Sequence, residues 1–126
     1  MKRAIKFRGK RPDGSWNYGR GILFKGDGSV SIHGAKVSPK TVGQFTGLKD
    51  MGGRDVYEGD IVRFSYLQMG LFSNKTLTLT GEVTADEYCN TVINVGGNEY
   101  HICNVDNGTV IGNVHDNPDL LKGGTR

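Results

Sequence analysis

Four carboxylates stand close together in the stretch TGLKDMGGRDVYEGDIVRF, residues 46–64: Asp50, Asp55, Glu58 and Asp60. Carboxylates that converge on one cleft are what a glycosidase or a metal-dependent hydrolase needs. Asp and Gly are also dominant turn residues, because Asp bonds nearby backbone N–H groups and Gly adopts positive φ. The neighbouring glycines favour the turn interpretation, in which Glu58-Gly59-Asp60 fixes the register of the strand that follows.

Other groups that could do chemistry are sparse. The chain has three histidines and two cysteines, Cys89 and Cys103, without a C-x-x-C or a helical H-x-x-x-H pair. A structural zinc site normally has four ligands, and motifs of this kind supply them at the required spacing. G-x-S-x-G is absent, and the two Gly-x-Gly stretches do not open a helix that would cradle a phosphate. The sequence therefore predicts no catalytic residue, no metal and no cofactor, and it leaves the redox state of the cysteines open.

The strongest binding candidate is the basic, aromatic N-terminal segment. Residues 1–11 contain six of the sixteen Lys and Arg and no acid. Cations bind phosphate and aromatic rings stack on bases, so the candidate ligand-binding residues are Lys6, Arg8, Arg11, Trp16, Tyr18 and Arg20. The alternative is that Trp16 and Tyr18 pack in the core or in a subunit interface, which is the commoner fate of such rings.

The uneven charge also bears on self-association. Beyond residue 11, ten basic residues face thirteen acidic ones. Such asymmetry indicates either an anionic partner or a basic strand that pairs with the protein's own acidic surface, in the same chain or in another copy. Candidates for a structural turn or an oligomer contact are therefore Asp50, Asp55, Glu58, Gly59 and Asp60.

The elements that position these residues are predicted to be short strands. A chain of 126 residues suits one domain, and 20 glycines with few helix-forming runs favour strands joined by tight turns. In residues 15–24 the even positions place Trp16, Tyr18 and Arg20 on one face, and the small odd face lets another backbone approach. Strands are predicted over residues 4–8, 15–24, 30–34, 41–45, 56–57, 61–66, 75–84 and 109–114, with a Gly96-Gly97 hairpin over residues 90–102. Residues 35–40 are predicted to be a loop. The apolar residues of 67–74 follow neither the period of a strand nor that of a helix.

The predicted fold class is mainly β. Many short antiparallel strands must close on themselves or cover their edges, so we expect an N-terminal β-hairpin followed by a small barrel. Asn117, Pro118 and Asp119 predict one short C-terminal helix. No apolar run reaches the length of a membrane span, and none follows the basic N-terminus as in a secretory signal. We therefore expect a cytoplasmic protein without a membrane partner.

Three segments together resemble the YopX family of small proteins encoded by phages and prophages: AIKFRG, VSPKTVGQFTGLKDMGGRDVYEGDIVRF and VIGNVHDNPDLL. The resemblance implies a single domain over residues 1–126. In it an N-terminal hairpin and extension, residues 1–45, precede a region similar to a small SH3-like barrel with the short helix, residues 46–122. It implies phage origin and a bacterial host cell. It implies no activity and no functional residues.

Three hypotheses for the function follow. The first is a non-enzymatic homo-oligomer acting in host takeover or counter-defence, which binds a host protein or sequesters a small nucleotide ligand. The second is a nucleic-acid-binding module on a small barrel, and the third is a nucleotide-directed hydrolase that uses the acids of residues 50–60. The first is favoured because no catalytic constellation is visible.

Overall fold

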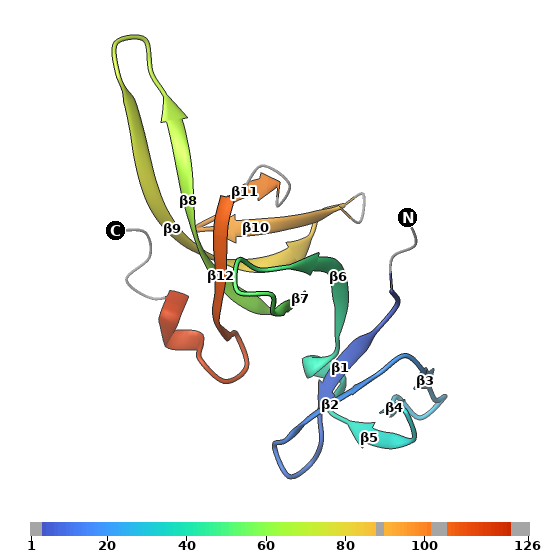
Figure 1. Ribbon diagram of the computed structural model, residues 1–126. Helices are drawn as coiled ribbons and strands as arrows, with labels where there is room; N and C mark the ends of the chain where they lie inside the picture. Colours follow the sequence, from blue (N-terminus) through green and yellow to red (C-terminus); the bar gives the residue numbers. More distant parts are fainter. Residues whose placement is uncertain (1–3, 88–89, 102–105, 122–126) are drawn as a thin grey trace. The chain divides into compact units, whose positions relative to one another are not determined.

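The structure is a computed structural model that describes residues 4–87, 90–101 and 106–121. The predicted mainly β class is confirmed, since antiparallel strands make up nearly all of the regular structure (Figure 1). The chain divides into two compact units: unit 1 contains Met1–Leu48 and Asp55–Tyr57, and unit 2 contains Lys49–Arg54 and Glu58–Arg126. The strands are β1 (Phe7–Lys10), β2 (Trp16–Gly19), β3 (Ile22–Phe24), β4 (Val30–Ile32), β5 (Ala35–Val37), β6 (Gly43–Lys49), β7 (Asp55–Tyr57), β8 (Asp60–Met69), β9 (Asn74–Ala85), β10 (Thr91–Val95), β11 (Asn98–His101) and β12 (Asp106–Asn113). The described residues also include the 3-10 turns η1 (Pro39–Thr41) and η3 (Pro118–Leu121).

Unit 1 packs two small sheets together, one ordered β2-β1-β6-β7 and the other β3-β4-β5. Its core cluster comprises Val30, Ile32 and Val37, against which Phe7, Ile22 and Val42 pack. The close approach expected of the small face of β2 is found, because a Cβ added at Gly19 would lie 2.8 Å from the Cβ of His33. Asn17 on the same face donates from Nδ2 to the carbonyl of Ile32 at 2.6 Å.

Unit 2 is a five-stranded antiparallel sheet in the order β11-β10-β9-β8-β12. Four strands follow one another as a meander, and β12 returns to pair with β8 through two register shifts. The Gly96-Gly97 turn joins β10 to β11 as predicted, with φ of 58° and 97°. No pairing joins β11 to β12 within the described ranges, so the sheet is open there and the predicted closed barrel is not found.

Three loops share one backbone design. In the loops from Arg11, Lys25 and Asp50, the first N–H donates to the carbonyl four residues on, and the fourth residue donates back to the first carbonyl. This is a type I turn followed by a left-handed residue. Glycine occupies that fourth position each time, at Gly14, Gly28 and Gly53, with φ of 87°, 89° and 86°.

Some predicted elements differ from the structure. The single strand predicted over residues 15–24 is two strands in different sheets, because the chain turns at Arg20 and Gly21 between β2 and β3. The loop predicted over residues 35–40 contains β5, which a two-residue turn at His33 and Gly34 joins to β4. His33 has φ 51°, which few side chains other than Asn, Asp and His adopt readily.

The C-terminal half differs in two further places. Residues 67–74 form the end of the β8–β9 hairpin, and β8 continues to Met69 before the turn. Where one short C-terminal helix was predicted, the described chain has the 3-10 turn η3, with Pro118 as its first residue. Within the described residues no helix has the length and apolarity to cross a membrane.

Candidate functional site

The β1–β2 hairpin gathers most of the candidate ligand-binding residues on one face. Arg8 lies opposite Tyr18 and Lys10 lies opposite Trp16, and residues directly opposite in an antiparallel pair point to the same face. Alternation along the chain adds Lys6 to this face. We call Lys6, Arg8, Lys10, Trp16 and Tyr18 the basic–aromatic face. Arg20 follows the end of β2 and is exposed.

Arg8 is the buried centre of this face. Its side chain is only 6% exposed. The guanidinium carbon lies 4.6 Å from the centre of the Trp16 ring and 5.0 Å from that of Tyr57. A guanidinium stacked on two rings is stabilised by cation–π attraction and holds those rings in place. Arg8 therefore organises the face rather than presenting its charge to solvent.

Lys6 is engaged within unit 1 as well. Its ammonium lies 2.7 Å from Oδ2 of Asp55, with both side chains less than a third exposed, and 4.4 Å from the centre of the Phe45 ring. At this contact the basic N-terminal strand pairs with an acidic residue of the same chain. This is one of the two arrangements that the charge asymmetry allows.

The solvent-facing part of the face is therefore smaller than the sequence suggests. Tyr18 is 53% exposed, and its ring touches Tyr57 edge-on with centroids 5.6 Å apart. Trp16 is half-buried, and the ammonium of Lys10 lies 5.5 Å from its ring centre. Arg11 belongs to the other face, where Nη2 donates to Oδ1 of Asn17 at 2.8 Å. Tyr18, the edge of Trp16, Lys10 and Arg20 thus remain as the surface a ligand can reach.

Asp50 holds its own turn and the neighbouring strand. Its Oδ1 accepts from the N–H groups of Gly52 and Arg54, and its Oδ2 accepts from the N–H of Val110 in β12 at 2.9 Å. Burial works to raise the pKa of Asp50. The backbone N–H donors of Val110, Arg54 and Gly52 outweigh it, so the pKa lies below its ordinary value. These are the contacts of a turn residue.

The other acids of residues 46–64 are spread over the two units. Asp55 belongs to unit 1, whereas Asp50, Glu58 and Asp60 belong to unit 2. Gly59 has φ 92°, donates to the carbonyl of Val83 and accepts from the N–H of Val114, so it ties the start of β8 to two other segments of unit 2. Asp60 is only 2% exposed. Among the described residues no three His, Cys, Asp or Glu gather where they would hold a metal ion, and Cys89 and Cys103 lie outside the described residues.

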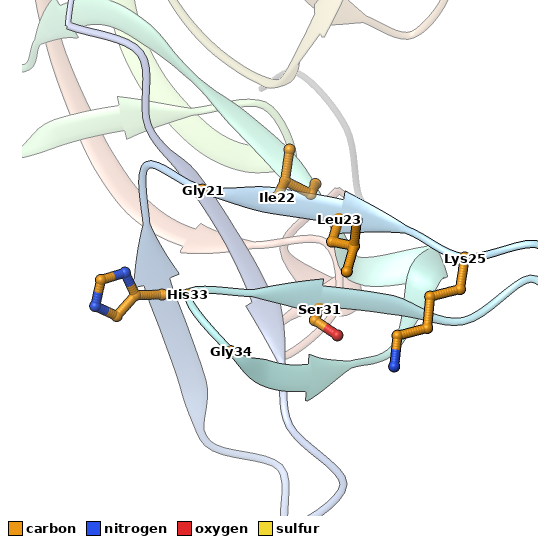
Figure 2. A pocket seen from close by; sticks show the side chains of 7 residues that line it. All are labelled: Gly21, Ile22, Leu23, Lys25, Ser31, His33 and Gly34. Atoms are coloured by element: carbon orange, nitrogen blue, oxygen red, sulfur yellow. The ribbon is translucent and has the colours of Figure 1, made fainter.

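Two hollows lie within single units. In unit 1 a shallow hollow of about 450 Å³ covers the outer side of the β3-β4-β5 sheet. Figure 2 shows Leu23, Lys25 and Ser31 projecting from one side of that sheet and Ile22 from the other. In unit 2 a pocket of about 570 Å³ is lined mainly by β9, β10 and β11 and includes Glu82. Burial raises the pKa of Glu82.

Sequence reasoning missed Phe45 and Tyr57, the rings that Lys6 and Arg8 contact. Both are 5% exposed. They reach the face because β6 pairs with β1 and β7 lies next to β6, an arrangement that no local pattern predicts. Tyr57 belongs to a three-residue strand, which is too short for alternation to assign a face.

The sequence that forms these elements can be compared with known protein families. A profile of the family described as YopX protein matches residues 7–122. The chain belongs to the YopX family. The YopX match begins at the first residue of β1, passes η3 and so covers elements of both units. A search of curated proteins finds no match to the chain.

Proposed function

We propose that this YopX protein is a non-enzymatic binding protein that takes a small nucleotide ligand on the basic–aromatic face of unit 1. The observation that carries the proposal is the β1–β2 register, which sets Tyr18 and Trp16 beside Lys10 on one face, while the exposed Arg20 directly follows β2. A base stacks on an exposed ring and phosphate oxygens bind cations, so one ligand of this class meets both kinds of group.

The small number of cations beside the exposed rings favours a small ligand. Lys6 and Arg8 are engaged with Asp55, Phe45, Trp16 and Tyr57. Lys10 and Arg20 then match one or two phosphates rather than the long phosphate ladder of a duplex. The sequence pI of about 8.9 also lies below the range typical of duplex-binding domains. A short single strand is the second candidate, because it offers the same base and phosphate groups.

A structural role for the acids supports a function without catalysis. Asp50 is bonded to three backbone N–H groups, and Asp55 is paired with Lys6. A hydrolase that used these carboxylates would have to release them from contacts that stabilise the fold. We therefore assign a structural role to Asp50 and Asp55.

The wider setting is proposed on the family resemblance. We infer a phage-encoded protein of the bacterial cytoplasm that acts as a homo-oligomer in counter-defence or host takeover. Unit 2 is proposed to be similar to a small SH3-like barrel. The order β11-β10-β9-β8-β12 supports this likeness, because such a barrel uses a four-strand meander followed by a fifth strand that returns to pair with the first.

The single tryptophan makes the ligand proposal testable, since Trp16 lies on the face itself. Ribonucleoside monophosphates, a cyclic dinucleotide and a short single-stranded oligonucleotide are titrated while Trp16 emission is followed. We expect a saturable change with at least one probe. Tyr18→Ala and Arg20→Ala should each weaken binding by about tenfold, which corresponds to about 1.4 kcal/mol. The control Lys36→Ala, an exposed strand cation of the other sheet in unit 1, should bind as the wild type does.

Two outcomes of this titration would count against the proposal. Equal affinity in wild type, Tyr18→Ala and Arg20→Ala would remove the face as the site. Silence of all probes would contradict the nucleotide class and favour the hypothesis of a host-protein partner, in which Trp, Tyr and Arg serve as interface anchors.

A further inference from the structure

The outer part of the β8–β9 hairpin is not explained by the ligand face. β10 pairs with β9 only over residues 82–85, and β12 pairs with β8 only as far as Ser65. Beyond these points the two strands pair with each other alone within the described chain. Figure 1 shows the hairpin extending beyond the other strands of its sheet. A two-stranded ribbon is marginally stable in water by itself, so a covering partner would stabilise it.

The tip of this hairpin is apolar and exposed. Leu71 and Phe72 are 96% and 98% exposed, the highest values among the large apolar side chains of the described residues. They lie in a turn in which the N–H of Gly70 donates to the carbonyl of Ser73 at 2.9 Å. Adjacent large side chains so completely in water are a typical contact point for a partner.

A complementary pocket lies at the base of the same hairpin. The unit 2 pocket of about 570 Å³ opens between β9 and the strands β10 and β11, where β9 leaves β10. Its apolar walls are Leu77, Leu79, Val95, Tyr100 and Leu121. It therefore borders the edge of β9 that pairs with no strand over residues 74–80 among the described residues.

The composition of the hairpin indicates which partner this edge takes. Between Arg63 and Glu82 the sequence contains one charged residue, Lys75, and no proline. Natural edge strands usually carry charges or proline, which prevent pairing. When an edge pairs antiparallel with its own copy about a two-fold axis, both sides of the seam come from the same strand, so a strand rich in one charge would bring like charges close together. A neutral edge therefore suits a second copy of this chain.

The opposite edge of the sheet, formed by β12, is covered by another segment of the chain. β12 is covered by the turn at residues 50–54, since Met51 donates to the carbonyl of Gly108 and Val110 donates to Asp50. One edge is thus blocked by hydrogen bonds from the chain itself. The outer part of β9 pairs with no second strand in the described chain, and Leu121 of η3 lies beside it in the pocket.

We propose that the free edge of β9 pairs antiparallel with the same edge of a second copy, and that Leu71 and Phe72 of each hairpin enter the pocket of the other. Antiparallel pairing sets each tip beside the base of the partner's hairpin, where the pocket lies. The inference rests on the homo-oligomer proposed above and names its interface. It does not use the ligand face of unit 1.

The test measures mass in solution by sedimentation velocity at 50 and 500 mM NaCl. We expect a wild-type dimer at both salt concentrations, because the interface is neutral and apolar. Thr76→Lys combined with Thr78→Lys places charges on the exposed outer face of β9 and should give a monomer. Leu71→Ser combined with Phe72→Ser should weaken the dimer at least about tenfold through loss of apolar burial. Thr109→Lys, an exposed threonine of β12, is the matched control and should remain dimeric.

Unchanged circular dichroism and Trp16 titration of each variant establish that folding and ligand binding are intact. A monomeric wild type, or a dimer that survives the paired lysines, overturns the interface and leaves the ligand proposal standing. A dimer that dissociates in 500 mM salt also overturns it, and favours the interface between basic strand and acidic stretch. An intact dimer without nucleotide binding overturns the ligand proposal alone.

Discussion

At the residue scale, position rather than type separates binding residues from structural ones. Arg8 and Arg20 both looked like candidate anion ligands, but Arg8 is buried between two rings and Arg20 is exposed. Alternation along residues 15–24 predicts that Trp16 and Tyr18 share a face. It cannot predict the pairing of Lys6 with Asp55, because 49 residues separate them and two further strands must assemble first.

The two arginines should therefore behave differently. We expect Arg8→Ala to lower the free energy of unfolding by about 1–3 kcal/mol, since it removes cation–π contacts to Trp16 and Tyr57 and leaves a gap between them. Arg20→Ala should change stability by less than about 0.5 kcal/mol. Urea denaturation followed by Trp16 emission measures both. Equal stability of the two variants would contradict the structural role of Arg8.

Asp50 gives a second residue-scale prediction, with a defined pH dependence. Its folded pKa lies below the unfolded one, so its stabilisation is fully present above about pH 4 and is lost as the pH falls through the folded pKa. Asp50→Asn turns one acceptor into a donor that faces backbone N–H, and should cost about 1–2 kcal/mol at neutral pH. Urea denaturation at pH 7 and at pH 3 measures this effect. The difference in unfolding free energy between wild type and variant should be smaller at pH 3 than at pH 7.

The matched control for Asp50→Asn is Glu87→Gln, which removes the same charge at an exposed position. It should leave the melts unchanged at both pH values. If Asp50→Asn folded with wild-type stability while losing a measurable turnover, the turn assignment would be wrong and the hydrolase hypothesis would return.

At the element scale, the turns were the features that the sequence predicted best, because they depend on local residue types. Gly96-Gly97 correctly predicted the β10–β11 hairpin. The break at Arg20 and Gly21 was missed because alternation runs unbroken through it, although β2 and β3 belong to different sheets. The hairpin end at residues 67–74 fitted neither the strand nor the helix period because Leu67, Leu71 and Phe72 are exposed, where no core imposes a pattern.

Gly59 tests how tightly a turn controls the start of a strand. Its φ of 92° lies in the left-handed region, so Gly59→Ala should destabilise the fold by about 1–2 kcal/mol. Gly26→Ala is the matched control, because Gly26 has open space for a Cβ and no such φ. Thermal unfolding should show a lower Tm for Gly59→Ala alone. Identical melting of both variants would show that the 58–60 turn does not set the register of β8.

At the scale of the whole molecule, two surfaces of different chemistry belong to different units. The basic–aromatic face belongs to unit 1, and the neutral hairpin with its pocket belongs to unit 2. The charge asymmetry that underlies the basic–aromatic face could be predicted from the distribution of charged residues along the sequence alone. The second depends on which strand edge remains unpaired, and that is decided by strand order, which sequence periodicity does not encode.

If the ligand binds on the basic–aromatic face of unit 1, NMR mapping will locate it there. A ¹⁵N-labelled sample is titrated with the nucleotide that shifts Trp16 emission. We expect the perturbed signals to cluster at Lys10, the Trp16 indole N–H, Tyr18 and Arg20, with unit 2 unaffected. Perturbations centred on Leu79, Glu82 and Tyr100, with the hairpin of β1 and β2 silent, would place the ligand in the unit 2 pocket and contradict the claim.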